Sequence, residues 1–268
     1  MILLLAWLLA IVHLRDVPEL TVTFFDVGQG DSTFIEWKDG TQMLVDGGPS
    51  TDVLSLLGRR MLPWDHHLDY IVLSHPHADH ARGLVAVLER FSVDEIITTS
   101  VGYDSDWFRA FVSSSAVSSA KTVAPWDATF PDDIELIYPL SRDDVLQSPN
   151  VNETSLVFQM NGTFPILFTG DIGVPVEQKL LREGRMDDIS VLKVGHQGSR
   201  NSSSVRWLEA LRPEVAVIMV GEGNEYGHPH GETLRRLEDL SVRILRTDTN
   251  GTIQLRIFRD RMDIRADY

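Results

Sequence analysis

Four side chains that can bind a metal ion lie within six residues of one another: His75, His77, Asp79 and His80. A single histidine in a loop is usually a surface residue without a specific function. Three imidazoles crowded beside a carboxylate are different, because they repel one another once protonated and a divalent cation relieves that repulsion. A loop can also turn alternate side chains toward two neighbouring points. The segment therefore predicts a metal site with room for two ions.

The composition limits which ligands such a site can use. The 268 residues include no cysteine, so thiolate ligands and disulfides are excluded, and the ligands must be histidine, carboxylate or carbonyl groups. The formal net charge of -15 argues against a surface that coats nucleic acid generally. It does not exclude a nucleic-acid substrate, because bound cations supply positive charge locally.

Further polar residues follow predicted apolar strands. Asp46, His75, Asp171 and His196 each lie just past the end of such a strand, and catalytic groups collect at these edges of α/β sheets. For Asp46 and Asp171 the alternative is turn capping, since aspartate is common in turns that contain glycine.

An Asn161-Gly162 turn lies between predicted strands at 155–160 and 163–168, and this dipeptide is typical of two-residue hairpin loops. Such a loop pairs residue 160 with residue 163 and, continued outward, places Asn152 opposite Asp171, ~5 Å away. The register predicts an amide oxygen beside the Asp171 carboxylate. The alternative is that Asn152 only ends a strand.

Strands and helices interleave, and hairpins are frequent. This pattern predicts an α+β fold of mixed sheets with helices outside them rather than a purely parallel sheet. The expected strands are at 21–25, 32–37, 41–45, 69–74, 94–99, 134–138, 155–160, 163–168, 190–194, 214–220, 242–246, 251–258 and 261–265. The expected helices are at 52–57, 81–89, 106–117, 175–183, 204–211 and 232–240.

The first twelve residues, MILLLAWLLAIV, form an uninterrupted apolar run. A membrane-spanning helix needs about 20 such residues, and a signal peptide needs basic residues before the run. We interpret residues 1–17 as the end of a transmembrane helix or anchor plus a linker, and residues 18–268 as a hydrolase domain. An unusual signal sequence and a buried helix of the domain are the alternatives.

Together these motifs carry a family resemblance. The segment from His75 to His80 is typical of the metallo-β-lactamase superfamily. With it, an ordered set of strings resembles the soluble domain of ComEC-type DNA-uptake (competence) proteins, over about residues 20–258. The strings are Phe25–Asp31, Leu44–Gly48, Phe168–Asp171, Leu192–Ser199 and Tyr226–Pro229.

The resemblance implies an αββα sandwich, with two divalent metal ions held between the sheet edges. It assigns His75 and His77 to the first ion, Asp79, His80 and His196 to the second, and Asp171 to both. It also implies that Asp46 orients a ligand histidine by a hydrogen bond, as metal-bound imidazoles usually require.

The chain departs from the family pattern at two positions. Asn152 stands where many members place a third histidine on the first ion. An amide oxygen in place of an imidazole shifts the metal preference of that site from zinc toward manganese or magnesium. Gln197 follows His196, where relatives often carry a second histidine. We assign the ligand role to His196 because it is retained; if the second histidine were the ligand, the role would be lost.

Two cations bridged by Asp171 can hold a hydroxide that is nucleophilic near neutral pH. The resemblance to DNA-uptake proteins, together with the apolar N-terminus, implies a phosphodiesterase, a nuclease acting on DNA during uptake, on the extracytoplasmic side of a membrane. Asp79 and Asp171 count as catalytic, and Ser199, Asn152 and His228 are candidates to bind phosphate oxygens or help the leaving group. A structural loop role is the alternative for His228.

Two other functions remain open at this point. The acidic composition favours a small-molecule phosphoester hydrolase, similar to a phosphorylcholine esterase. The asparagine at position 152 favours a non-catalytic, metal-stabilised domain of a membrane channel. Asp26 and Asp31 are interpreted as turn and scaffold residues near the site. The oligomeric state is not predicted.

Overall fold

The computed structural model describes residues 17–99, 102–148 and 150–267. The expected anchor falls on residues 1–16 and so lies outside the described residues. Within the described ranges, no helix has both the length and the apolar character needed to cross a membrane.

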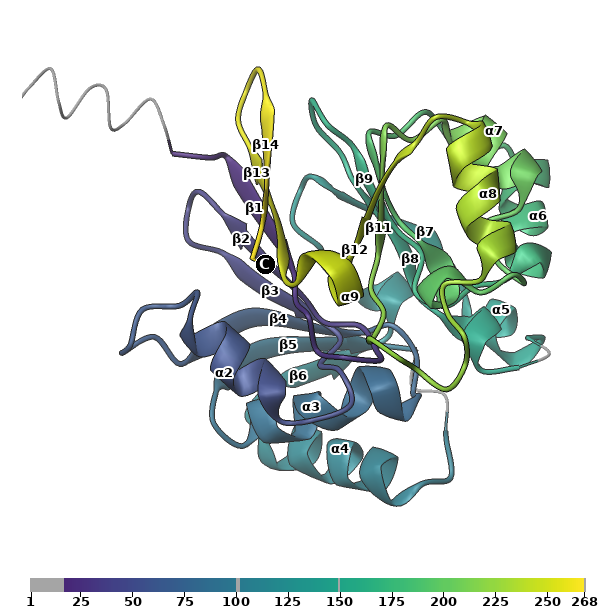
Figure 1. Cartoon of the computed structure of the whole chain (residues 1–268). Helices are drawn as coiled ribbons and strands as arrows, with labels where there is room; N and C mark the ends of the chain where they lie inside the picture. The colour runs from purple at the N-terminus through teal and green to yellow at the C-terminus, as the bar shows by residue number, and fades with distance from the viewer. Residues whose placement is uncertain (1–16, 100–101, 149, 268) are drawn as a thin grey trace, which may run out of the picture.

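Two mixed sheets face each other in the middle of the molecule (Figure 1). The first has the order β14-β13-β1-β2-β3-β4-β5-β6, with parallel pairing from β3 to β6 and antiparallel pairing elsewhere. Its strands are β1 (Leu20–Phe24), β2 (Thr33–Trp37), β3 (Gln42–Val45), β4 (His67–Leu73), β5 (Ser92–Thr98), β6 (Lys121–Val123), β13 (Ile253–Ile257) and β14 (Met262–Ala266).

The second sheet has the order β12-β11-β10-β9-β8-β7 and pairs in parallel from β9 to β12. Its strands are β7 (Ile134–Tyr138), β8 (Val157–Met160), β9 (Ile166–Phe168), β10 (Val191–Lys193), β11 (Val215–Ile218) and β12 (Arg243–Arg246). Each sheet thus combines parallel and antiparallel pairs, and the expectation of mixed sheets is confirmed.

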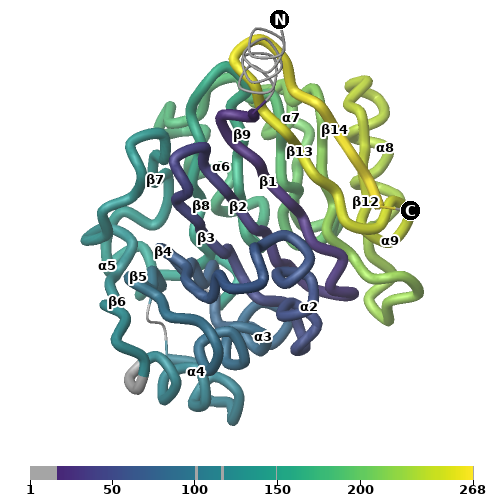
Figure 2. The backbone as a smooth tube through the Cα atoms, turned by 90° about the vertical axis from the view of Figure 1, so that its left-hand side faces the viewer, coloured from purple at the N-terminus to yellow at the C-terminus, as the bar shows by residue number. Residues whose placement is uncertain are grey.

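Helices cover the outer face of each sheet, as Figures 1 and 2 show. The first sheet is covered by α2 (Asp52–Gly58), α3 (Ala78–Leu88) and α4 (Asp106–Val117). The second is covered by α6 (Val174–Arg182), α7 (Val205–Leu211) and α8 (Gly231–Asp239), with α5 (Arg142–Leu146) at its β7 end. A short α9 (Thr247–Asn250) leads from β12 into β13 and so joins the two sheets.

Alternation along the strands explains the three apolar layers. Successive residues of a strand point to opposite faces, so on β2 Ile35 packs between the sheets while Phe34 packs against the helices. On β10, Val191 faces the other sheet and Leu192 faces the helices. All four are fully buried, and each such side chain stabilises the fold by roughly 1.5–3 kcal/mol. The αββα sandwich is therefore confirmed.

The helix expected at 81–89 begins earlier, at Ala78, with His77 as its N-cap residue. Asp79 and His80 consequently lie in its first turn, where the helix dipole favours a carboxylate. The metal-binding segment is thus half loop and half helix. This geometry turns Asp79 and His80 to different sides of one turn.

The register expected for the hairpin with the Asn161-Gly162 turn, formed by β8 and β9, is wrong. Met160 pairs with Ile166 instead of with residue 163, so five residues form the loop. Pro165 lies in that loop and has no N–H to give to a ladder. Continued outward, the observed register brings Ser155 to Asp171, whose backbone N–H donates to Ser155 Oγ at 3.0 Å. Asn152 instead lies in a 3-10 turn, η2 (Asn152–Thr154).

Two glycines let α3 pack directly on the chain that follows β3. A Cβ atom at Gly83 would collide with the carbonyl oxygen of Gly47. The backbone N–H of Gly47 donates to the carbonyl of His80 at 2.7 Å, and that of Gly83 donates to Gly48 at 3.1 Å. These contacts fix the height of α3 above the end of β3.

We expect Gly83→Ala to destabilise the protein by roughly 1–3 kcal/mol, the usual cost of overpacking, although alanine favours helices. Urea unfolding measures this. Gly58→Ala is the matched control, because a Cβ atom at this other helical glycine meets nothing within 4 Å. Equal unfolding free energies for the two variants would contradict the close packing of α3.

Candidate metal centre

Three buried side chains converge where strands of the two sheets end. His75 follows β4, His80 lies in α3 and Asp171 follows β9, and their ligand atoms all lie within 4.8 Å of one another. His80 Nε2 is 3.4 Å from Asp171 Oδ2 and His75 Nε2 is 3.9 Å from it. The cluster therefore joins two halves of the chain that are distant in sequence.

Three buried atoms in or beside this cluster have no hydrogen-bond partner among the residues that the structure describes: His80 Nε2, Asp171 Oδ1 and Asn152 Oδ1. Buried polar atoms nearly always have a partner, and an unmatched group points to a water or ion. An imidazole nitrogen, a carboxylate oxygen and an amide oxygen are all ligands for divalent cations. The residues present therefore fit a metal ion.

Asp46 fixes the orientation of His80. Its Oδ2 atom is 2.8 Å from His80 Nδ1, and its two oxygens also accept from the backbone N–H of Ser74 at 2.8 Å and from Ser74 Oγ at 2.7 Å. Because a carboxylate in these contacts only accepts, Nδ1 carries the hydrogen and the lone pair of Nε2 faces the cluster. Asp46 reaches this position with φ of 57°, a left-handed conformation that aspartate tolerates better than most residues.

The charges around His80 make the cluster strongly negative. Burial alone would lower the pKa of His80, but the carboxylates of Asp171, Asp79 and Asp46 outweigh it and hold that pKa well above the usual value. A site that retains a proton so strongly also attracts a metal cation, because the two compete for the same lone pair. Burial lowers the pKa of His75 well below its usual value, so this imidazole is neutral and available as a ligand.

The remaining residues of the motif lie beside these three. His77 Nδ1 is 3.1 Å from His75 Nε2, and burial lowers the pKa of His77. Asp79 Oδ2 is 3.7 Å from His80 Nε2. The structure thus brings together the expected ligands of both ions from this segment.

His196 lies to one side of the cluster. Its Nε2 atom is 3.2 Å from Asn152 Nδ2, and its ring contacts that of His228 with centroids 5.6 Å apart. The neighbouring Gln197 reaches Asp79 instead, donating from Nε2 to Oδ2 at 2.7 Å. The assignment of His196 to the second ion remains a prediction.

An open cavity of about 320 Å³ leads to the cluster. It is lined by His77, Ala78, Asp79, Tyr103, Asn152, Asp171, His196, Gln197, Tyr226 and His228. Asn152 and His228 thus lie at the site, Asn152 through η2 and not through the predicted strand pairing. Ser199 is absent from this lining: it is buried, and its Oγ accepts from the backbone N–H of Asn201 at 3.3 Å.

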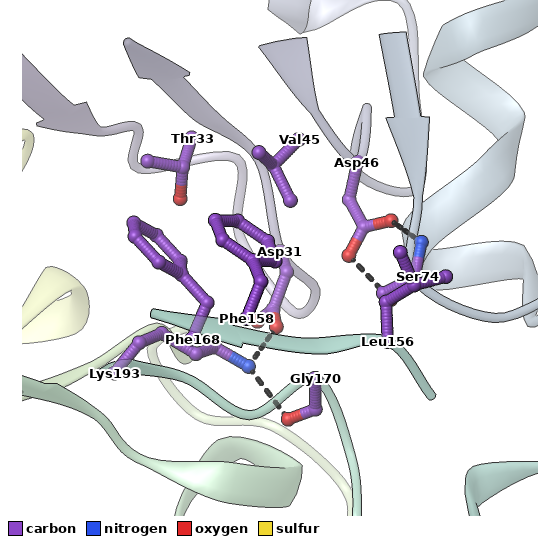
Figure 3. Close-up of a pocket in the computed structure, with 10 residues that line it drawn as sticks. All are labelled: Asp31, Thr33, Val45, Asp46, Ser74, Leu156, Phe158, Phe168, Gly170 and Lys193. Carbon is purple, nitrogen blue, oxygen red and sulfur yellow. Dashed lines mark hydrogen bonds and ion pairs between the residues drawn. The ribbon is translucent and has the colours of Figure 1, made fainter. Parts of the chain in front are cut away.

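A buried ion pair behind the cluster was missed in the sequence. Lys193 Nζ pairs with Asp31 and donates to the carbonyl of Gly170 at 2.9 Å (Figure 3). It also lies 3.8 Å from Asp171 Oδ1. Each charged side chain is only 3–4% exposed. The available signal was a lysine inside an otherwise apolar buried strand, because lysine is almost never buried without a partner.

The pair closes the seam between the sheets. Burial raises the pKa of Asp31 to about 6, although Lys193 and His80 oppose the rise. Burial would lower the pKa of Lys193, but Asp31 and Asp171 raise it above its usual value, so the ammonium stays charged. Beside the pair is a cavity of about 10 Å³, walled in part by Thr33 (Figure 3), which has room for about one water molecule.

Comparisons with known proteins agree with this geometry. The model of the metallo-beta-lactamase superfamily matches residues 25–222. ComE operon protein 3 of Bacillus subtilis is 30% identical over 88% of this chain and 33% of its own length. Competence protein ComA of Neisseria gonorrhoeae is 28% identical over 90% of this chain and 33% of its own length. The chain thus spans about a third of these relatives.

A solved structure shows the same fold. The metallo-beta-lactamase fold protein YhfI of Bacillus subtilis superposes with a TM-score of 0.57 at 14% identity, over 87% of this chain and 98% of its own.

We expect Lys193→Met to destabilise the protein by about 3–5 kcal/mol, since it leaves a buried carboxylate uncompensated. Adding Asp31→Asn removes that charge, so the double variant should recover much of the loss. Urea unfolding of the two single variants and the double variant measures the coupling. Additive losses would contradict a paired role for the two residues.

Proposed function

The chain belongs to the metallo-beta-lactamase superfamily, a group of metal-dependent hydrolases, and we propose that it is a phosphodiesterase, a nuclease that acts on DNA during DNA uptake. The observation that carries this proposal is the group of His75, His80 and Asp171, with unmatched buried atoms, beside a cavity open to solvent. Such a site is able to hold cations and admit an anionic substrate together.

The proposed centre holds two divalent ions. His75 and His77 would hold the first, Asp79, His80 and His196 would hold the second, and Asp171 would contribute to both. When bound, such ions stabilise charge on a phosphate and make a water molecule acidic enough to act as a nucleophile. The unmatched amide oxygen of Asn152 favours manganese or magnesium over zinc at the first position.

We assign His228 a role in binding the substrate and not the metal ions. Burial, together with the neighbouring His196 and His230, lowers its pKa to about 4, so it is neutral at pH 7. Its Nδ1 atom is buried without a partner in the described protein. We assign it to hydrogen bonding a phosphate oxygen and not to proton donation, because an imidazolium with this pKa is hardly populated at neutral pH.

Two features support DNA as the substrate. One relative carries competence in its name, and Tyr226 presents a flat ring at the cavity. Tyr226 is 60% exposed, and its ring stacks on that of His228 with centroids 5.8 Å apart. Nucleobases stack on exposed aromatic rings of this kind, largely without regard to sequence.

The cellular setting of the proposal follows from the relatives and from the apolar N-terminus. We place the hydrolase domain on the extracytoplasmic side of a membrane, anchored by residues 1–17 or by a longer parent protein. The net charge of -15 keeps a small phosphoester as the second candidate substrate, because an acidic surface repels a DNA backbone unless bound cations offset it.

With manganese, the protein should hydrolyse bis-p-nitrophenyl phosphate and labelled DNA. Asp171→Ala and His77→Ala should lower kcat on both by more than the roughly 10- to 100-fold that loss of an outer-shell partner of a metal ligand costs. His67→Ala is the control, since His67 belongs to another His/Asp group, with Asp69 and Asp94 on the first sheet, and should leave kcat unchanged.

Three results would change the proposal. Cleavage of the small ester with DNA left intact would support the phosphoester alternative. Metal binding without cleavage of either substrate would support the non-catalytic domain. Equal losses of kcat in His67→Ala and Asp171→Ala would show that the metal centre is not the site of hydrolysis.

A further inference from the structure

Asp79 differs from the other acidic group of the cluster in its exposure. The Asp79 side chain is 32% exposed, whereas that of Asp171 is 3% exposed and those of His75 and His80 are fully buried. Packing therefore fixes the other three residues but not this carboxylate. A partly exposed carboxylate is less restricted by packing than a buried one, so hydrogen bonds have more influence on its orientation.

A chain of two side-chain amides ends on Asp79. The backbone N–H of Gly221 donates to Gln29 Oε1 at 3.0 Å. Gln29 Nε2 then donates to Gln197 Oε1, and Gln197 Nε2 donates to Asp79 Oδ2 at 2.7 Å. Gln197 is 3% exposed, so water competes little for these bonds.

The direction of this chain is fixed at both ends. A backbone N–H only donates and an ionised carboxylate only accepts. Gln29 must therefore turn its oxygen to Gly221, and Gln197 must turn its nitrogen to Asp79. The flip ambiguity that usually attends side-chain amides is removed, because the reverse orientation of either glutamine would set donor against donor or acceptor against acceptor.

Close backbone contacts hold the start of the chain in place. A Cβ atom at Gly30 would collide with the carbonyl oxygen of Asp79, and one at Gly221 would lie 2.6 Å from the backbone nitrogen of Gln29. The backbone N–H of Asp31 also donates to the carbonyl of Asp79 at 3.1 Å. The loop after β1 is thus pressed against both α3 and the end of β11, which gives the amides a rigid base.

The backbone at Gln197 is adapted to this contact. His196 and Gln197 have φ of 49° and 53°, two successive left-handed residues that are neither glycine nor asparagine. Such conformations are unfavourable and persist where the surroundings require them, often at functional sites. Here they send the Gln197 side chain to Asp79 and the His196 side chain to Asn152.

We propose that Gln29 and Gln197 form an amide relay that positions the Asp79 carboxylate for a divalent cation. The oxygen that accepts from Gln197 is also the one 3.7 Å from His80 Nε2, and a carboxylate oxygen has a second lone pair for a ligand bond. Gln197 is thus a positioning residue. The proposal rests on the metal centre of the proposed function but not on its phosphodiesterase activity.

Manganese binding to the full chain, measured by isothermal titration calorimetry, tests the relay. Gln197→Glu keeps the length of the side chain but replaces the donor with an acceptor that repels Asp79. It should weaken binding of one ion, the one that Asp79 would hold, by roughly 10- to 100-fold, as loss of an outer-shell partner of a metal ligand does. Gln29→Ala, which has no direct contact with Asp79, should weaken the same ion, but should add little when combined with Gln197→Glu.

Gln159→Ala is the matched control: Gln159 is a buried glutamine on β8 whose amide bonds to Asn161, and its loss should leave both affinities unchanged. Affinities within twofold of the wild type in the two relay variants would overturn the proposal, as would additive losses or a wild-type chain that binds no manganese. Two bound ions and an intact relay effect without DNA cleavage would refute the nuclease and leave the relay standing.

Discussion

Buried negative charge is the constraint on which the rest of this structure depends. Asp31, Asp46 and Asp171 are each at most 3% exposed, and an ionised carboxylate is costly to bury unless it is paired and hydrogen-bonded. Lys193 lies between Asp31 and Asp171, and His80 bonds to Asp46. These partners do not use every lone pair: among the described residues, Asp171 Oδ1 and His80 Nε2 are buried without a hydrogen-bond partner. The candidate metal centre is thus the part of this charge network whose atoms are not paired within the protein.

The fold makes this network possible because each sheet supplies part of it. His75 and Asp46 follow strands of the first sheet, while Asp171 and Lys193 belong to the second. Asp31, which follows β1 of the first sheet, has its counter-charge, Lys193, on the second. Docking of the sheets through their apolar inner faces therefore assembles the ligands and their counter-charges in one step, and the cavity opens along the seam that results.

Local patterns predicted much of this from the sequence. The segment from His75 to His80 and the aspartates after the strands were found because their signal lies within a few residues. Mixed sheets with helices outside followed from the order of strands, helices and hairpins, and the αββα sandwich followed from the family resemblance. The hairpin register was wrong because Asn161-Gly162 predicts a two-residue loop, whereas Pro165 has no N–H to donate to the ladder and lies in a longer loop. Asn152 reached the site regardless, through η2.

Contacts between distant segments were not predictable in this way. Asp31 meets Lys193, and Gln29 meets Gln197, only because the loop after β1 packs against the end of β10. No periodicity or turn signal reports such a pairing. The assignment of His196 to the second ion came from the family resemblance and stays a prediction. The left-handed backbone at residues 196 and 197 and the contact of Gln197 with Asp79 are seen only in the structure.

The most direct test of the account is the anomalous diffraction of crystals grown with manganese. Two peaks are predicted, one against His75 and His77 and one against Asp79 and His80, with the Asp171 carboxylate between them. A peak confined to another His/Asp group, or no peak among these residues at saturating manganese, would contradict the claim that the buried charge network is a two-metal centre.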